Sequence, residues 1–234
     1  MSTRIALILV LLSVGGCSVP ISTTTRPASY YEPVAVQTDS SSTSLFKNDS
    51  AVLSDEAIAR VLGHRYQAPP LSRVALMPFG REVWSSWSEE LARASAKTKT
   101  NVVTALRASP RIYDVSFLPD ILIPEHKSVP HLRQAAARYQ ADLLLIYRTD
   151  CRSFDRYRLF AADESRSHCS VEAVLLDTRT GLVPFTSVVS ESFQATQTAA
   201  DINFRETVLK AQLDASARAL ATVADELRTF MARN

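Results

Sequence analysis

A short apolar run at residues 143–147, with the sequence Leu-Leu-Leu-Ile-Tyr, constrains the fold of this chain more than any other feature. Apolar and polar residues do not alternate in it, so the strand that it predicts must be buried on both faces. Strand patterns of this kind alternate with helical patterns along the chain, which predicts an α/β fold.

Strand and helix patterns alternate before this run. Residues 74–79 and 112–118 predict two further strands. A helix is predicted from Pro130 to Tyr139, because proline is favoured in a first helical turn. Helices that lie between strands predict parallel pairing with right-handed crossovers. Between the first two strands, side chains of a long amphipathic helix recur at steps of three or four residues: Trp84, Trp87, Leu91, Ala94, Thr98, Val102 and Ala105.

The pattern changes after residue 147. Residues 170–176 and 182–189 predict strands joined by a tight turn, in which Gly181 suits the left-handed position. Leucines at 213, 220 and 227 belong to a long C-terminal helix. Their seven-residue spacing leaves a coiled coil open, but a helix that covers the sheet is favoured. The predicted fold is one α/β domain with a mixed sheet: three parallel strands with crossover helices, an antiparallel hairpin and a long C-terminal helix.

The N-terminus has the layout of a secretory signal peptide, with Arg4, an apolar run at residues 5–12 and small residues after it. The run is far shorter than the roughly 20 residues of a spanning helix. Residues 12–17, Leu-Ser-Val-Gly-Gly-Cys, resemble the bacterial lipobox. The resemblance implies cleavage before Cys17 and acyl chains on it, and Ser18 in place of aspartate favours the outer membrane. An ordinary signal peptide with an unmodified Cys17 is the alternative.

Four segments follow from these patterns. We predict a signal peptide at 1–16, a lipidated N-terminus with a flexible Ser/Thr/Pro-rich linker at 17–53, a short helix and connector at 54–71, and a periplasm-facing α/β domain at 72–234. The linker shows no persistent helical or strand period and has too few apolar residues to form a core. Ser54 is placed to cap the short helix.

Two cysteines remain besides Cys17, an even number in an oxidising compartment. If the strands around them pair antiparallel with Cys151 opposite Cys169, Arg148 falls opposite Glu172, and charge meets countercharge. The same register pairs apolar residues: Leu144 with Leu176, Leu145 with Leu175, and Ile146 with Val174. Opposed residues lie within disulfide reach, so we predict a Cys151–Cys169 disulfide that closes a long hairpin loop. Two free thiols are the alternative.

Structural motifs of the domain resemble those of a group of bacterial lipoprotein domains. They are a first strand ending in Pro78-Phe79, an Ala141-Asp142 entry to the third strand, and a Thr180-Gly181 hairpin. The group includes the curli-secretion lipoprotein, the lipoprotein activators of penicillin-binding proteins and the N-terminal domain of the Tol periplasmic protein. The resemblance covers roughly residues 72–230. It implies a domain that binds other envelope proteins or assembles, rather than an enzyme.

Residues 152–168, between the two cysteines, are interpreted as an excursion from the sheet. Arginine and aromatic side chains are enriched there, as they are at interface centres. The alternative is that Leu159 and Phe160 pack on the domain and the charges are solvated. We predict a partner-binding loop that uses Arg152, Arg156, Tyr157, Arg158 and Phe160.

Several functional classes are excluded or disfavoured by composition. A net charge of +2 gives no basis for nucleic-acid binding, and five glycines cannot supply a phosphate-binding loop. The four histidines form no pair at i,i+4, and no Gly-x-Ser-x-Gly elbow is present. We therefore predict no catalytic residue, no metal site and no cofactor. Trp84 and Trp87 are interpreted as core residues, with a glycan groove as the alternative.

The expected function is that of a non-enzymatic lipoprotein, held in outer-membrane lipid through Cys17 and facing the periplasm. We expect it to bind a protein partner in cell-envelope biogenesis or maintenance. Two alternatives stay open. One is an oligomerising subunit of a secretion or surface-assembly complex, in which the chain forms a homo-oligomer. The other is a cell-wall glycan binder or enzyme.

Overall fold

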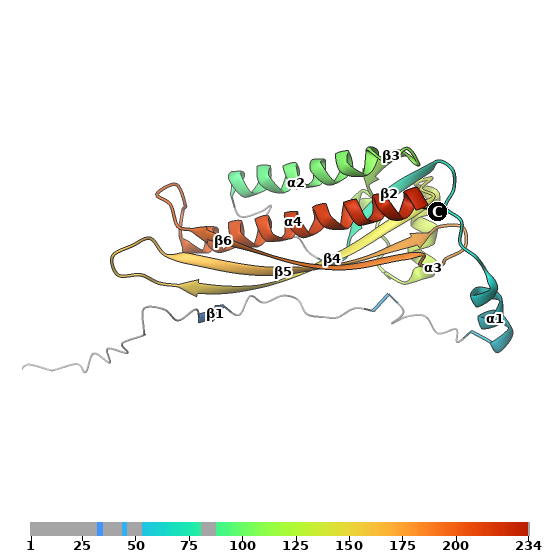
Figure 1. The fold of residues 1–234 in the computed structure, drawn as a ribbon, viewed down its shortest axis with the longest axis horizontal. Coiled ribbons are helices and arrows are strands. Elements are labelled where there is room, and N and C mark those ends of the chain that lie inside the picture. The colour runs from blue at the N-terminus through green and yellow to red at the C-terminus, as the bar shows by residue number, and fades with distance from the viewer. Residues whose placement is uncertain (1–31, 35–43, 46–52, 81–87, 234) are drawn as a thin grey trace, which may run out of the picture.

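The fold is given by a computed structural model, which describes residues 32–34, 44–45, 53–80 and 88–233. Helices cover one face of a single elongated sheet along much of its length and the other face only at one end (Figure 1). The elements follow in the order β1 (Glu32–Val34), α1 (Asp55–Gly63), β2 (Ser72–Pro78), α2 (Glu89–Arg107), β3 (Ile112–Phe117), the 3-10 turn η2 (Asp120–Leu122), α3 (Val129–Arg138), β4 (Leu143–Arg156), β5 (Glu164–Asp177), β6 (Phe185–Thr196) and α4 (Phe204–Arg233).

The sheet has the strand order β3-β2-β4-β5-β6, and β1 pairs with β4. β2 runs parallel to both β3 and β4, whereas β4, β5 and β6 are joined as antiparallel neighbours. The predicted mixed sheet, with three parallel strands and an antiparallel hairpin, is confirmed. We call the end that holds β2, β3 and α3 the proximal end, and the end at the β4–β5 turn the distal end (Figure 1).

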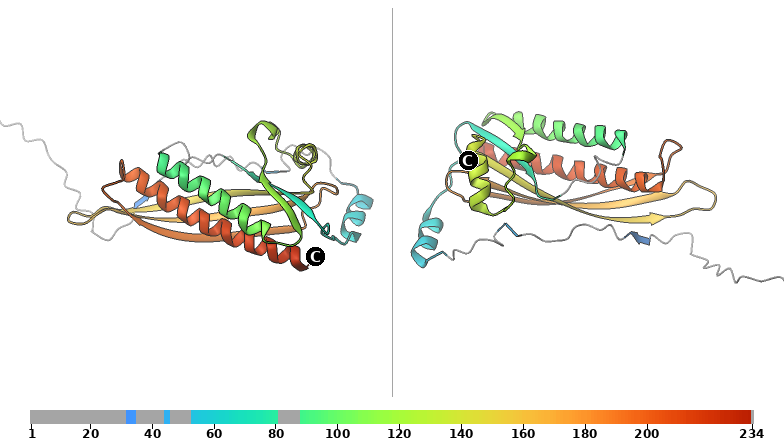
Figure 2. Two further views of the ribbon diagram at one scale, coloured as in Figure 1. Left: turned by 90° about the horizontal axis from the view of Figure 1, so that it is seen from above. Right: turned by 180° about the vertical axis from the view of Figure 1, so that it is seen from behind.

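Helices cover the two faces of the sheet unequally. α2 and α4 lie side by side across one face, here the inner face (Figure 2). α3 packs on the opposite, outer face at the proximal end. Leu143, Leu145 and Tyr147 of β4 point to the inner helices, and Leu144 and Ile146 point to α3. Burial on both faces is why the sequence of this segment is continuously apolar.

The C-terminal helix α4 covers the inner face along much of the sheet. Its Leu220 and Leu227 belong to the same core cluster as Leu145, and Leu213 packs further along with Cys151. The seven-residue leucine spacing therefore serves packing on the sheet, and the prediction of a covering helix is confirmed over the coiled-coil alternative.

The excursion predicted between the two cysteines is mostly strand, so that prediction is wrong. β4 continues to Arg156 and β5 begins at Glu164, which leaves residues 157–163 as the turn. The buried positions here are small and polar, as at Ser153 and Ser167, so no apolar alternation reveals the strands. The register that pairs the cysteines simply continues outward.

Two other boundaries also differ from the sequence prediction. β6 starts at Phe185 and runs to Thr196, well past the predicted end at residue 189. In residues 190–196, exposed Ser, Gln and Thr alternate with half-buried side chains, so the strand continues although the sequence there is mostly polar. Within the predicted linker, Glu32–Val34 form a strand on the edge of β4. The distal half of that edge extends beyond β2, and unpaired strand edges readily accept another strand.

The turn between β5 and β6 follows the prediction. Gly181 has a φ of 78°, in the left-handed region that glycine adopts without strain. Its backbone N–H donates to the carbonyl oxygen of Asp177 at 2.8 Å.

Within the described part of the chain, no helix is both long enough and apolar enough to cross a membrane.

Candidate functional site

The distal half of the sheet is the part of the structure that carries the candidate site. We define the distal arm as residues 148–156 of β4, 164–172 of β5 and 188–196 of β6, together with the turn 157–163. Even-numbered residues of these strands share the outer face, because directly opposed residues in an antiparallel ladder point the same way. Odd-numbered residues point inward to α4.

A disulfide stands near the base of the arm on the inner face. Cys151 and Cys169 oppose each other in the β4–β5 ladder and are bonded, as the sequence predicts. Leu209 and Leu213 of α4 pack in the same cluster as the two sulfurs. The other predicted pairs are also observed: Leu144 with Leu176, Leu145 with Leu175, Ile146 with Val174, and Arg148 with Glu172, whose charged groups are 2.7 Å apart.

Beyond the disulfide, the inner face of the arm becomes polar. Ser153 and Ser167 are opposed and buried, and their hydroxyl oxygens are 2.7 Å apart. The side-chain amide of Gln212 on α4 donates to Ser153 Oγ at 2.9 Å. Buried polar groups are stable only when they are hydrogen-bonded, as these are. The arm therefore docks on α4 through a hydrogen-bonded interior.

A cluster of charges closes the distal end of α4. Lys210 Nζ lies 2.5 Å from Asp201 and 2.8 Å from Glu90. Glu206 accepts hydrogen bonds from the backbone N–H of Ile202 at 2.8 Å and from the Ser88 hydroxyl at 2.7 Å, and these two bonds hold the pKa of its carboxyl below the usual value.

The neighbouring Asp201 has a lowered pKa for a related reason. Burial raises its pKa, but hydrogen bonds from Lys210 and from the backbone N–H of Thr198 outweigh burial. The pKa of Lys210 is raised, because its bonds to Asp201 and Glu90 outweigh burial. All three groups are therefore held in their charged forms, and they join the β6–α4 connection to the start of α2.

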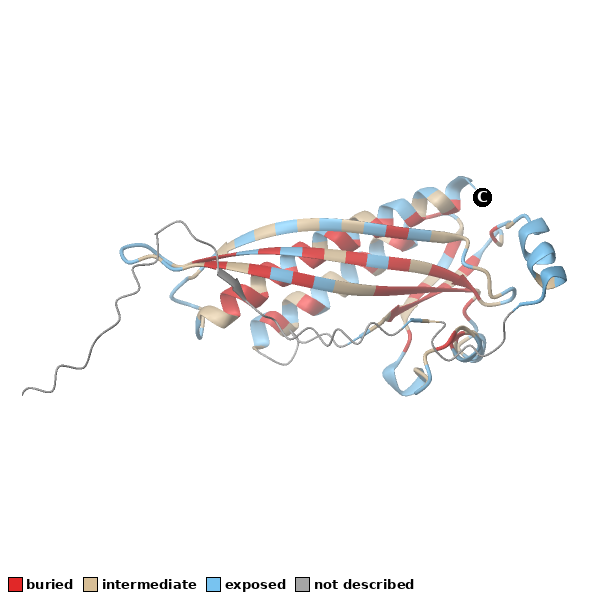
Figure 3. Cartoon of the chain, turned by 90° about the horizontal axis from the view of Figure 1, so that it is seen from below, coloured by how far each residue is buried: buried red, intermediate tan, exposed pale blue. Residues whose placement is uncertain are grey.

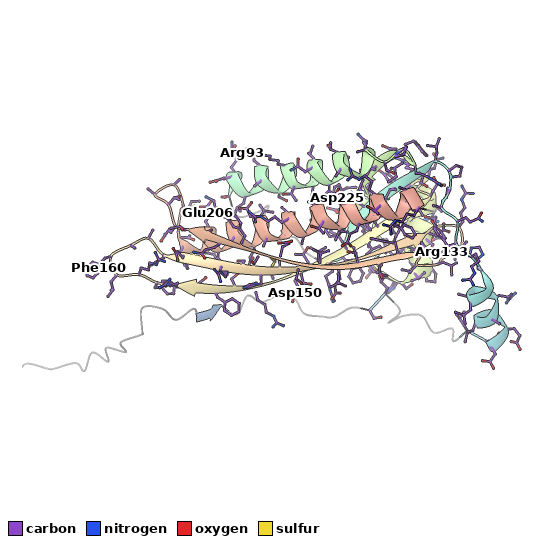
Figure 4. All side chains as sticks on the ribbon, in the orientation of Figure 1. Arg93, Arg133, Asp150, Phe160, Glu206 and Asp225 are labelled. Carbon is purple, nitrogen blue, oxygen red and sulfur yellow. A yellow bond between two sulfur atoms is a disulfide. The ribbon has the colours of Figure 1, made fainter. Side chains whose placement is uncertain are left out.

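The outer face of the arm presents arginine and aromatic side chains. Arg152 opposes His168, and Phe154 opposes Arg166. The rings of Phe154 and His168 meet edge to face, 5.8 Å between centroids. Arg166 donates to the side-chain oxygen of Gln194 on β6 at 3.2 Å. No helix in the described part of the chain covers this face beyond Asp150, which points outward from the middle of β4 (Figure 4).

The turn at the tip of the arm is tied down by polar groups and exposes apolar ones. Arg158 pairs with Glu164 at 2.6 Å, and its backbone N–H donates to Asp163 at 2.8 Å. Leu159 and Phe160 are fully exposed, and Figure 4 shows Phe160 at the extreme end of the arm. The alternative in which these two side chains pack on the domain is wrong.

The five predicted partner-binding residues do not form one patch. Arg152 is exposed on the outer face, and Arg156 is half-buried there. Tyr157 turns toward α4, where its ring lies 5.2 Å from that of Phe204. Arg158 is held by the ion pair with Glu164. Phe160 lies at the tip, where Leu159 is the other exposed apolar side chain.

Three outer-face residues were not among the predicted binding residues: Phe154, Arg166 and His168. The signal for them was available, because extending the cysteine register by one and by three residues places all three on the same face as Arg152.

A small hollow of about 20 Å³, partly open to solvent, lies between α2, α4 and the sheet. Among its lining residues Lys99 alone is charged, and hydroxyls of Thr98 and Ser216 alternate with apolar side chains such as Val102.

Some of the remaining sequence predictions concern described residues, and others concern residues outside the described part of the chain. In the described residues, no three His, Cys, Asp or Glu side chains gather as a metal site. The lipobox with Cys17 lies outside the described residues, as do Trp84 and Trp87, whose core and glycan-groove interpretations stay predictions.

No protein-family model matches this chain, and no curated protein sequence matches it. The fold is similar to CT253, a hypothetical protein of Chlamydia trachomatis, with a TM-score of 0.41, 10% identity and coverage of 70% of this chain and 99% of that one. A minor lipoprotein from Acinetobacter baumannii has a TM-score of 0.33 and 10% identity over 70% of this chain and 95% of that one. The PelC dodecamer from Paraburkholderia phytofirmans has a TM-score of 0.32 and 14% identity over 66% of this chain and 88% of that one.

These structural neighbours include bacterial lipoproteins. The narrower resemblance to curli-secretion, activator and Tol domains stays a prediction. At such identities and scores, no conclusion about function is drawn from them.

Proposed function

We propose that this chain is a lipid-anchored protein of the outer membrane that faces the periplasm and binds an envelope protein without catalysing a reaction. The observation that carries the binding role is the outer face of the distal arm. There, Arg152, Phe154 and Arg166 stand on paired strands that a disulfide closes. Presentation on a fixed sheet lowers the entropy that binding costs.

The chemistry of this face selects the class of partner. Nearer the base, Arg148 is paired with Glu172 and Asp150 adds a negative charge, so positive charge does not dominate there. Toward the tip, Arg152 and Arg166 dominate and flank the Phe154 ring. A partner surface with carboxylates around an apolar contact would complement it, since complementary charge raises the association rate and rejects wrong partners.

The anchor in this proposal is Cys17. The apolar run, the small residues and the cysteine occur in the order that lipid attachment requires, and several acyl chains on one residue give stable membrane attachment. Ser18 after the cysteine supports the outer membrane. Intact mass and membrane fractionation of the wild type and of Cys17→Ser test this part. We expect acyl mass and outer-membrane flotation for the wild type only, and an unacylated wild type would refute the anchor.

The non-enzymatic part of the proposal is supported by the charged cluster at the start of α4. The charged groups at Asp201, Glu206 and Lys210 are bonded to one another or to backbone, as a structural clamp would be.

Site-specific crosslinking in cells tests the binding role. A photoreactive residue at Arg152 is expected to capture a distinct envelope protein, identified by mass spectrometry, whereas one at the exposed Arg93 of α2 is not (Figure 4). The double charge reversal Arg152→Glu/Arg166→Glu should abolish capture from a neighbouring outer-face position, Ser170, and Arg93→Glu should leave it intact.

Capture at both sites alike, or capture unaffected by the double reversal, would refute the outer face as the binding surface. Crosslinking to a second copy of the same chain would instead support the oligomerising alternative.

A further inference from the structure

We propose that the distal tip of the arm inserts into the headgroup–acyl boundary of the membrane that holds the anchor, so that the protein contacts one membrane at two points. This inference rests on the proposed lipid anchor at Cys17. Its core is a pair of adjacent apolar side chains at the extreme end of the molecule: Leu159 is 93% exposed and Phe160 is 101% exposed. Ala161 and Ala162 follow them and are also exposed.

The charged groups of the tip have partners within the tip. Arg158 is paired with Glu164 at 2.6 Å, and Asp163 accepts the Arg158 backbone N–H at 2.8 Å. The Asp163 carbonyl also accepts the backbone N–H of Gln197 at 2.8 Å, which ties the turn to the β6–α4 connection. Paired charges and satisfied backbone groups lower the cost of bringing this turn into a less polar environment.

A second connection adds an apolar side chain at the same end. The β6–α4 connection begins after Thr196, which pairs with Glu164, and it therefore lies beside the tip (Figure 1). Ile202 in this connection is 72% exposed. Tyr157, half-exposed behind the tip, packs on Phe204, the first residue of α4. Tyrosine at such a position suits the membrane interface, where one end of its ring is apolar and the other wet.

The direction of β1 selects the membrane end. β1 is antiparallel to β4, with Glu32 opposite Asp155 and Val34 opposite Ser153. β4 runs toward the tip, so β1 runs away from it, and the chain that precedes Glu32 enters the sheet from the distal end. That chain carries Cys17. The anchor is thus connected to the same end of the domain as Leu159 and Phe160.

Reach allows this contact. Fifteen Cα–Cα steps separate Cys17 from Glu32, a span of at most about 50 Å. The tip lies only four or five residues beyond Asp155, roughly 15 Å further along the arm. Exposed apolar side chains alone do not identify the membrane-facing end, because Leu62 and Ile121 at the proximal end are also exposed. The direction of β1 identifies the distal end, since the chain that leads to Cys17 leaves β1 on that side.

The shape of the tip favours a bilayer over a protein as its occupant. Two fully exposed side chains at the end of a tight turn form a convex wedge, and a fluid membrane accepts such a wedge without a matching pocket. Interfacial elements combine this kind of apolar tip with polar flanks. A protein partner would have to supply a fitted pocket, because binding hot spots lie in well-packed pockets.

Fluorescence quenching in reconstituted vesicles tests the inference on the full acylated chain. With Cys17 acylated and Cys151–Cys169 bonded, an introduced cysteine is the only free thiol. An environment-sensitive dye is attached in Ala161→Cys and, as the matched control, in Leu62→Cys on α1. The vesicles contain phosphatidylethanolamine, phosphatidylglycerol and a spin-labelled phospholipid. We expect quenching and a blue shift at position 161 and neither at position 62.

Removal of the apolar pair completes the test. In the Ala161→Cys background, Leu159→Ser/Phe160→Ser is expected to reduce the inserted population by about tenfold or more. Leu62→Ser/Ile121→Ser in the same background should leave quenching unchanged. Circular dichroism on both double variants checks that the fold is intact. We expect no change, because the substituted side chains are exposed and do not contribute to the core.

The outcomes separate the two proposals. Acylated protein that floats with vesicles but shows no quenching at position 161 would overturn the tip insertion and leave the anchor standing. Acylated protein whose tip is unquenched and crosslinks to an envelope protein would assign the tip to a protein partner, and would also overturn it. A chain without acyl mass that fails to float would overturn the anchor, and the tip inference with it.

Discussion

The proximal and distal halves of the same strands both contain buried residues (Figure 3), but they pack on the same helix through different chemistry. On the inner face of β4, the proximal half presents Leu143, Leu145 and Tyr147, all buried in an apolar cluster with α4. The distal half presents Ser153 and Asp155, buried among polar groups. Burial and backbone geometry are alike in the two halves, and only the side-chain chemistry changes.

The difference teaches where stability is concentrated. Burial of a large apolar side chain stabilises by about 1.5–3 kcal/mol, whereas a typical buried hydrogen bond contributes a net 0.5–1.5 kcal/mol or so. The proximal half therefore holds most of the free energy of folding. The disulfide stands near the boundary, where it fastens the weaker half to the stronger.

The largest expected effect comes from the proximal core. Leu145→Ala is expected to lower the free energy of unfolding by about 2–5 kcal/mol, because a cavity forms where the leucine contacts α4. Urea denaturation measures it. Val188→Ala, on the exposed outer face of β6, is the matched control and should change stability by less than about 0.5 kcal/mol. Equal losses from the two substitutions would contradict the proximal core as the main source of stability.

The next effect comes from the disulfide. Replacement by Cys151→Ala/Cys169→Ala is expected to cost about 3 kcal/mol, because the bond closes a segment of 18 residues in the unfolded chain. Hydrogen exchange should rise in the distal arm and stay slow at residues 143–147. Chemical reduction of the wild type should give the same pattern. A uniform loss of protection in both halves would contradict a difference in stability between them.

A smaller effect is expected in the polar interior. Ser153→Ala removes the acceptor of the Gln212 amide and the partner of the Ser167 hydroxyl, and a buried group left without a partner costs about 1–3 kcal/mol. Thermal unfolding checks this against Ser190→Ala, which alters an exposed hydroxyl on the outer face. If Ser153→Ala were neutral, the hydrogen bonds would not be what holds the arm to α4.

The smallest expected effect is local and depends on pH. The pKa values of Asp201 and Glu206 are lowered in the folded protein, so their contribution to stability is present above the unfolded carboxyl pKa. It is lost as the pH falls through the lowered folded values. Hydrogen exchange at residues 198–206, corrected for the pH dependence of the intrinsic amide exchange rate, should therefore rise on acidification before exchange in the proximal core does.

A variant isolates the acidic clamp. Glu206→Gln keeps the shape of the side chain but removes its charge, so the acid-dependent rise in exchange should become smaller. The raised pKa of Lys210 has the opposite sign, and its contribution is lost only as the pH rises through that value. An unchanged acid response in Glu206→Gln would assign the effect to other groups.

The sequence by itself determined the proximal half of this protein. Continuous apolar runs and helical spacing give the parallel pairing and the covering helix, because apolar burial leaves a period that can be read along the chain. The Cys151–Cys169 register gives the antiparallel pairing of β4 with β5 at the boundary of this half. The lipobox-like segment at Cys17 is also read from the sequence alone and stays a prediction.

Only the tertiary structure decided the distal half. Ser153, Asp155, Ser165 and Ser167 are buried, yet their polarity hides the strand period that their burial would otherwise reveal. The outer face that unites Arg152, Phe154 and Arg166, and the tip that leaves Phe160 bare, depend on how far the hairpin extends. The inner face of the hairpin is held by a hydrogen bond from Gln212, on a helix some sixty residues away from Ser153, and this contact has no local sequence signature.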